Sequence, residues 1–178
     1  MPWVLRHPSF LLWLATLVIW LPWLGNQPLR DWDEGIVASV AHSTMSQPGL
    51  DWLVAVQWTN AYLNKPPGLH WLIGFITTNF TTQEWGIRLG PAIISSLAIP
   101  LRLGLRIELD HPYQQHMGRS RSQFVGSIAG VVLMTLLPMA RHGRLAMLDG
   151  SLRACSLLSF YGQILGRRMA SGGVLAGL

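Results

Sequence analysis

Three carboxylates fall within four positions directly after a long uncharged stretch. Residues 7–29 contain no Asp, Glu, Lys or Arg, and residues 30–35 then read Arg-Asp-Trp-Asp-Glu-Gly. Charged side chains beside a membrane-type apolar segment are costly unless they face water or a partner. A carboxylate of this cluster, which comprises Asp31, Asp33 and Glu34, is suited to act as a general base if the rest of the chain positions it.

Two later stretches carry the cations that such a site needs. Residues 62–67 contain Lys65, the single lysine of the chain, next to two prolines, and residues 141–150 contain Arg141, Arg144 and Asp149. An arginine fork matches phosphate oxygens, and a lysine offers them a compact point charge. We therefore predict that the three stretches form one site on one face of a membrane, where a lipid-linked phosphate can reach it. An alternative is that these charges are only interfacial anchors and ion pairs at helix ends, which contribute little to stability.

Composition places the chain among membrane proteins. Half of its 178 residues are apolar and 12% are charged, whereas soluble domains contain about 25% charged residues. The nine tryptophans fit interfacial belts. The net charge of +5 comes from arginines dispersed among apolar runs, which argues against nucleic-acid binding. One cysteine excludes an intramolecular disulfide.

The apolar runs predict an all-α, multi-spanning membrane protein with about four transmembrane helices. Residues 8–29 are long enough to cross a bilayer, and Arg6 and His7 before them favour a cytoplasmic N-terminus. A cleaved signal peptide is the alternative, but no small-x-small cleavage site follows the run. The other expected crossings are 89–105, 123–140 and 150–166.

Residues 31–87 are expected to form an extracytoplasmic loop with juxtamembrane helices. The sequence predicts a short helix from Ile36, an extended stretch over residues 52–58, and a helix over 68–80 that starts after two prolines. If 68–80 also crossed the membrane, the acidic cluster and Asp149 would lie on opposite faces. We therefore place it along the interface, which leaves 106–122 as a cytoplasmic loop and satisfies the positive-inside rule.

Four short motifs resemble the N-terminal part of the membrane glycosyltransferases that use polyprenyl-phosphate sugars, a group that includes the protein O-mannosyltransferases and the lipid A aminoarabinose transferases. Members of that family are longer, so the chain is interpreted as an N-terminal portion. The motifs are an Asp-Glu pair after the first helix, a basic motif ending in prolines, a Trp-Gly-x-Arg element and an Arg-x-x-x-Leu-Asp signature. They correspond here to Asp33-Glu34, Asn64-Lys65-Pro66-Pro67, Trp85-Gly86-Ile87-Arg88 and Arg144 to Asp149.

The resemblance implies transfer of a sugar, with inversion, from a polyprenyl or dolichyl phosphate to a protein or glycolipid acceptor outside the plasma (inner) membrane. It implies that Asp33 is the general base, although Asp31 is an equal candidate from the residues alone. Glu34 would support the base or bind the acceptor or a metal, and Asp149 would orient groups across the site. The donor phosphate would be held by Lys65, with Arg144 and Arg88 as further candidates. The sequence itself gives no evidence for a metal cofactor. The alternative function is an integral membrane protein without catalytic activity that binds lipid or a partner.

Overall fold

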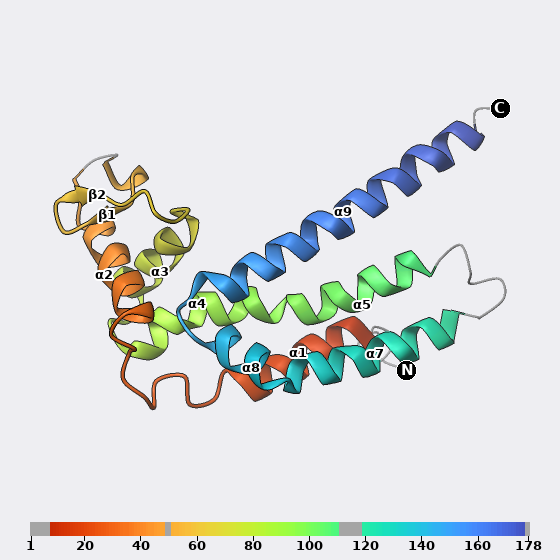
Figure 1. Cartoon of the computed structure of the whole chain (residues 1–178), viewed down its shortest axis with the longest axis horizontal. Helices are drawn as coiled ribbons and strands as arrows, with labels where there is room; N and C mark the ends of the chain where they lie inside the picture. The colour runs from red at the N-terminus through yellow and green to blue at the C-terminus, as the bar shows by residue number, and fades with distance from the viewer. Residues whose placement is uncertain (1–7, 49–50, 111–118, 177–178) are drawn as a thin grey trace.

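The structure is a computed structural model that describes residues 8–48, 51–110 and 119–176, and these are mostly helical (Figure 1). The prediction of an all-α fold is confirmed. A 3-10 turn over Asp51–Leu53 precedes two short antiparallel strands, β1 (Val56–Gln57) and β2 (Asn60–Ala61). The α-helices are α1 (Pro8–Trp20), α2 (Asp33–Met45), α3 (Gly68–Asn79), α4 (Glu84–Ser96), α5 (Ala98–Leu109), α7 (Arg119–Thr135), α8 (Leu137–Arg144) and α9 (Leu148–Ala176).

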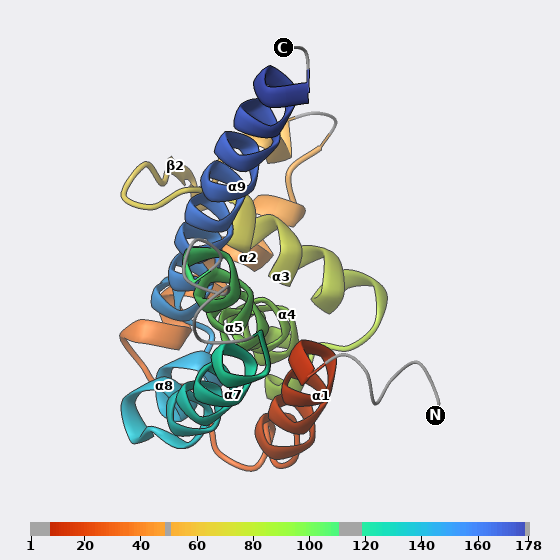
Figure 2. The same cartoon turned by 90° about the vertical axis from the view of Figure 1, so that its right-hand side faces the viewer.

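The helices form a bundle with a smaller lobe at one end. Helix α5 packs against α1, α7 and α9, and Figure 2 views several of these helices nearly end-on. Helices α2 and α3 and the hairpin make up the lobe, and α4 links it to the bundle by packing against α3, α8 and α9. The end of α5, the start of α7 and the end of α9 lie at the opposite end of the molecule from the lobe (Figure 1).

Two clusters of buried apolar side chains hold this arrangement together. Burial of such side chains is the main favourable term in folding. The first cluster joins α2, α3, α4 and the segment before α9, and the second joins α5, α8 and α9. The first comprises Val37, Ala41, Leu69, Ile73, Ile87 and Ala146, and the second comprises Ala98, Met139 and Ala154.

The helices predicted after the acidic cluster are present. The helix expected from Ile36 belongs to α2, which already begins at Asp33, and the helix expected over 68–80 is α3. The extended stretch predicted over 52–58 is a strand only at Val56–Gln57. The loop predicted over 106–122 is shorter than expected, because α5 continues to Leu109 and α7 begins at Arg119, and residues 111–118 lie outside the described ranges.

The helix bounds differ from the predicted crossings, and prolines explain two of the differences. Pro138 has no N–H to donate to the carbonyl of Met134, four residues earlier. The indole N–H of Trp20 donates to that carbonyl instead, at 3.2 Å, and the chain bends by 63° between α7 and α8. The predicted crossing 123–140 is therefore divided. Likewise, 89–105 is divided at Leu97, where Pro100 lies in the first turn of α5.

The remaining two crossings differ in length. The predicted helix 8–29 ends at Trp20, whose side chain turns into the protein, and 150–166 lies within the longer helix α9. In the described part of the chain, no single helix combines the length and the apolar character needed to cross a membrane. The bent pair of residues 121–135 and α8 satisfies both requirements when taken together.

Candidate functional site

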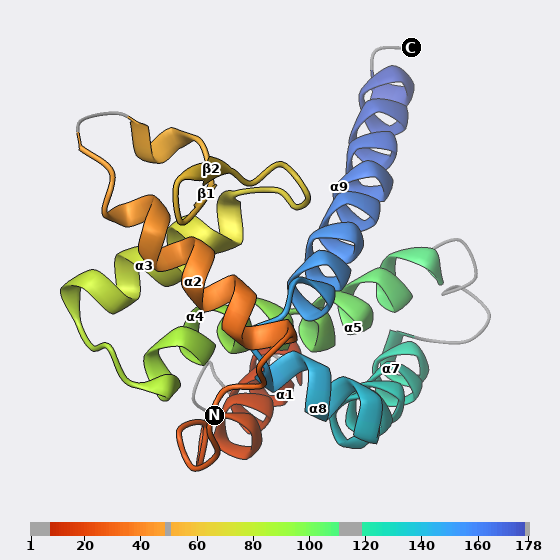
Figure 3. The same cartoon turned by 60° about the vertical axis from the view of Figure 1, so that its left-hand side comes forward.

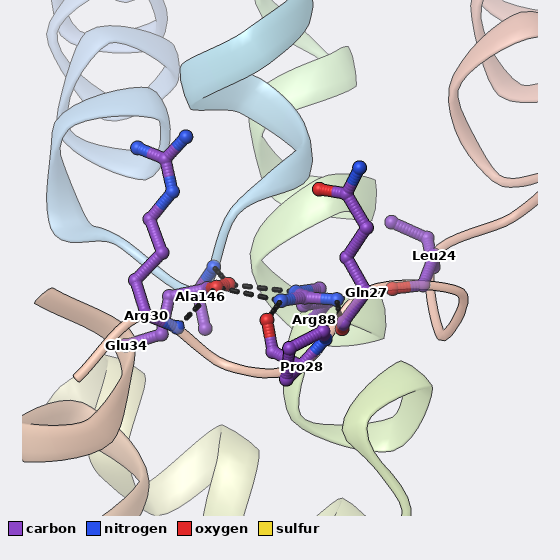
Figure 4. A network of polar contacts seen from close by, with 7 residues as sticks. All are labelled: Leu24, Gln27, Pro28, Arg30, Glu34, Arg88 and Ala146. Atoms are coloured by element: carbon purple, nitrogen blue, oxygen red, sulfur yellow. Dashed lines mark hydrogen bonds and ion pairs between the residues drawn. The ribbon is translucent and has the colours of Figure 1, made fainter.

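A buried ion pair between Glu34 and Arg88 lies where the lobe meets the bundle (Figure 4). Arg88 Nε donates to one carboxylate oxygen and Nη2 to the other, both at 2.7 Å. The side chains are 5% exposed for Arg88 and fully buried for Glu34. This two-point geometry is the strong form of an arginine–carboxylate contact.

Backbone groups satisfy the rest of both side chains. Arg88 Nη1 donates to the carbonyls of Leu24 at 2.6 Å and Gln27 at 2.8 Å, and Nη2 donates to that of Pro28 at 3.0 Å. With the two bonds to Glu34, the five donors of the guanidinium are all used. Glu34 also accepts from the backbone N–H of Ala146, at 2.8 Å, and from that of Arg30, at 3.3 Å. One ion pair thus ties together residues 24–30, α2, α4 and the segment that precedes α9.

Local sequence explains how these side chains reach one another. Glu34 lies in the first turn of α2 and Arg88 is the fifth residue of α4. The Gly35 N–H donates to the Arg30 carbonyl at 2.8 Å, which closes the turn into α2. Burial raises the pKa of the Glu34 carboxyl, but the bonds from Arg88 and from the Ala146 and Arg30 amides outweigh it and lower the pKa below 4.5. Glu34 is therefore held as a carboxylate.

An arginine-rich cavity of about 430 Å³ opens beside this ion pair. We call it the arginine pocket. Among the described residues, four arginines and no acidic residue line it. The lining residues are Trp23, Leu24, Asn26, Gln27, Pro28, Arg30, Arg88, Arg141, Arg144 and Leu145. An excess of guanidinium groups around a hollow of this size is suited to hold an anion such as phosphate.

Arg144 and Arg30 illustrate the donors that this pocket offers. Arg144 Nη2 donates to the Pro22 carbonyl at 2.7 Å, whereas its Nε is buried and has no hydrogen-bond partner among the described residues. The backbone of Arg30 binds Glu34, but its guanidinium points away from the ion pair, to the same side as the Gln27 amide (Figure 4). The expected alternative, a pair between Arg30 and Asp31 or Asp33, is not among the ion pairs of the described residues. A buried donor without a partner is costly, and an anion would satisfy it.

The structure brings three of the four predicted motifs together. Asp33 precedes Glu34 in the first turn of α2, and Asp149 lies in the first turn of α9, three residues after Ala146. The starts of α2 and α9 therefore lie side by side, as Figure 3 also shows. Both carboxylates are exposed, and neither lines the arginine pocket itself.

Lys65 does not join this group. It is exposed and lines a separate cavity of about 430 Å³ next to the hairpin, together with Tyr62 and Pro66. The hairpin is fixed at the C-terminal end of α2, where the Val56 N–H donates to Thr44 Oγ1 at 2.9 Å. Glu34 is at the other end of that 13-residue helix, which is about 20 Å long at 1.5 Å per residue.

His70, in the predicted lysine motif, is fully buried. Its ring lies edge-on to Tyr62 with 5.7 Å between centroids, and neither ring nitrogen has a side-chain partner in the described structure. Burial lowers the pKa of the imidazole below 6.5, as does the positive charge of Lys65, while the Pro66 backbone opposes them. The structure thus places His70 in the interior of the lobe.

Sequence reasoning missed the neutral wall of the arginine pocket, which Trp23, Asn26 and Gln27 provide. Their only signal was position, because they lie between the first apolar run and the acidic cluster. The described residues contain no group of three or more His, Cys, Asp or Glu placed to hold a metal ion. Comparisons with protein-family models, with curated proteins and with solved structures found no match.

Proposed function

We propose that the chain is the N-terminal part of a membrane glycosyltransferase that moves a sugar from a polyprenyl or dolichyl phosphate to a protein or glycolipid acceptor on the extracytoplasmic face. The observation that carries the proposal is the arginine pocket, where the described part of the chain gives Arg144 a buried Nε without a partner and supplies no acidic lining residue. It supports an anionic ligand held at the point where the predicted motifs converge.

The arginines suit the chemistry of the leaving group. In the proposed reaction an oxygen of the acceptor forms a bond with the anomeric carbon of the sugar. The bond from that carbon to the phosphate oxygen breaks, and its electron pair leaves with the lipid phosphate. Negative charge therefore grows on the phosphate, and fixed guanidinium donors stabilise charge that develops in the transition state. Arg144, Arg141 and Arg30 take this role.

Asp33 receives the acceptor's proton in this proposal. It is exposed at the start of α2, next to the buried Glu34 in sequence, and Asp149 is exposed in the first turn of α9, the helix that follows Ala146, which donates to Glu34. Glu34 and Arg88 are assigned a positioning role, because their carboxylate and guanidinium groups already bind each other and the backbone. Lys65 has no part in the proposed phosphate site, since it lines a separate cavity.

Exposed apolar side chains support a membrane location. Water-exposed apolar patches of this extent are unusual on soluble proteins. We propose four crossings, formed by α1, by α4 with α5, by α7 with α8, and by α9, with the N-terminus in the cytoplasm and the lobe outside. The large exposed apolar side chains of α1, α7 and α9 include Leu14, Val18, Ile19, Phe124, Val125, Ile128, Val131, Val132, Leu152, Leu158 and Phe160.

Two substitutions in the full-length protein test the proposal. Arg144→Gln should weaken binding of a polyprenyl phosphate in detergent or nanodiscs by about tenfold or more, because it removes a charge-assisted contact. Asp33→Asn should abolish sugar transfer and leave lipid-phosphate binding unchanged, and Asp31→Asn is the matched control. Unchanged transfer in Asp33→Asn removes Asp33 as the base. Binding that is unchanged in Arg144→Gln argues against the phosphate site. Phosphate binding without transfer by the full-length wild-type protein favours the lipid-binding alternative.

A further inference from the structure

Trp23 combines a strained backbone with an exposed side chain. Its φ of 60° lies in the left-handed region, which is unfavourable for a bulky residue. Its residue surface is nonetheless 73% exposed, so burial of the indole does not compensate for the strain. Residues held in such conformations are concentrated at ligand sites.

Both neighbours of Trp23 are held by arginines of the arginine pocket. The carbonyl of Pro22, the preceding residue, accepts from Arg144 Nη2 at 2.7 Å. The carbonyl of Leu24, the following residue, accepts from Arg88 Nη1 at 2.6 Å. Arg144 of the proposed phosphate site and the positioning residue Arg88 thus fix the backbone on either side of Trp23.

Trp23 lines two cavities. It lines the arginine pocket and also an open cavity of about 410 Å³ that Gln83 and Trp85 line as well. Asn26 lines both cavities, and Gln27 lines the arginine pocket. An aromatic face is therefore bordered by amide groups, which can donate to and accept from hydroxyl groups, and by cations.

We infer that Trp23 is a stacking platform for the sugar ring of a glycosyl phosphate whose phosphate occupies the arginine pocket, an inference that rests on the proposed function. A pyranose presents one face of C–H groups with partial positive charge, and the indole face is negative. Its hydroxyl groups, which lie around the rim of the ring, require polar partners, and Asn26 and Gln27 provide them. The amides and arginines around the indole favour a sugar over an isoprenoid chain at this position.

The test compares two soluble phosphates on the full-length protein, by calorimetry in detergent. Glucose 1-phosphate and methyl phosphate share the anionic group, and only the first has a sugar ring. The wild type should bind glucose 1-phosphate about three- to tenfold more tightly than methyl phosphate. Trp23→Ala should abolish this preference without changing methyl phosphate binding, and Trp23→Phe should keep part of it.

Trp32 provides the matched control, because it is 82% exposed, belongs to the same connecting segment and does not line the arginine pocket. Trp32→Ala should retain the preference. If Trp23→Ala also retains it, or if the wild type binds both phosphates equally, the platform is wrong while the phosphate site stands. If the wild type binds neither phosphate, the proposed phosphate site fails and the platform fails with it.

Discussion

Replacing Glu34 by glutamine should destabilise the protein far more than its small change in shape suggests. Glu34 is fully buried and receives four hydrogen bonds, two from Arg88 and two from backbone amides. Glutamine keeps one acceptor oxygen, but its NH₂ group faces donors. Arg88, 5% exposed, is then left as a buried cation without its counter-ion.

The expected cost follows from that uncompensated charge. Removing one partner of a buried ion pair costs about 3–5 kcal/mol, because the remaining charge keeps its desolvation penalty. The neighbouring substitution Asp33→Asn makes the same chemical change at an exposed position, where surface changes stay within about 0.5 kcal/mol. The two variants therefore differ by one residue in position and by several kcal/mol in expected effect.

Reversible denaturation of the full-length protein in detergent measures the difference. The wild type should also lose stability as the pH falls below 4.5, because the folded pKa of Glu34 is lowered and the unfolded chain then binds the extra proton. Glu34→Gln should lack this component of the acid transition. A Glu34→Gln loss no larger than that of Asp33→Asn, with an unchanged acid transition, would refute the structural role of the ion pair.

Two further predictions concern the lobe and the packing of the bundle. Because the pKa of His70 is lowered in the folded protein, the free energy of unfolding should be constant above about pH 7.5 and fall as the pH drops through 6.5. His70→Phe should flatten this dependence in melting curves recorded at several pH values. An unchanged dependence would show that another group titrates. Gly143→Ala should lower Tm, because the added Cβ would collide with the Trp20 ring. Gly162 in α9 has open space around it, so Gly162→Ala should stabilise that helix by about 1 kcal/mol. Equal melting temperatures for the two alanine variants would contradict the close approach of α8 to Trp20.

Helix content was predictable from the sequence, and Pro138 and Pro100 mark two of the helix breaks. Apolar runs alone contain little information on where a helix bends. What the sequence does not show is the partner of the carbonyl that Pro138 leaves free, because Trp20 and Met134 are 114 residues apart. The end of α1 has the same origin, because Trp20 is drawn into the protein instead of continuing a straight helix.

The candidate site was predictable as a set of motifs, but not as a set of roles. The Asp-Glu pair, the Trp-Gly-x-Arg element and the 144–149 motif meet in space through long-range contacts, namely the bonds of Glu34 to Arg88 and Ala146 and the apolar cluster that includes Ile87 and Ala146. Lys65 has the right chemistry for phosphate, yet the hairpin holds its loop at the far end of α2. The sequence shows which side chains are charged, whereas the distance between the Lys65 loop and the arginine pocket depends on how the lobe packs.

The two members of the Asp-Glu pair have different environments, because Glu34 is buried and Asp33 is exposed to water. Successive residues on an α-helix point about 100° apart, and in the first turn of α2 Glu34 is buried whereas Asp33 is exposed. Glu34 takes the buried direction, where Arg88 and two amides hold it ionised. Asp33 takes an exposed direction. A general base must exchange protons and reach an acceptor, and the buried Glu34 is already bound by four donors. In the proposed reaction Asp33 is therefore the member of the pair suited to be the base. Glu34 instead fixes the backbone of Arg30 and, through Arg88, that of Leu24 next to Trp23.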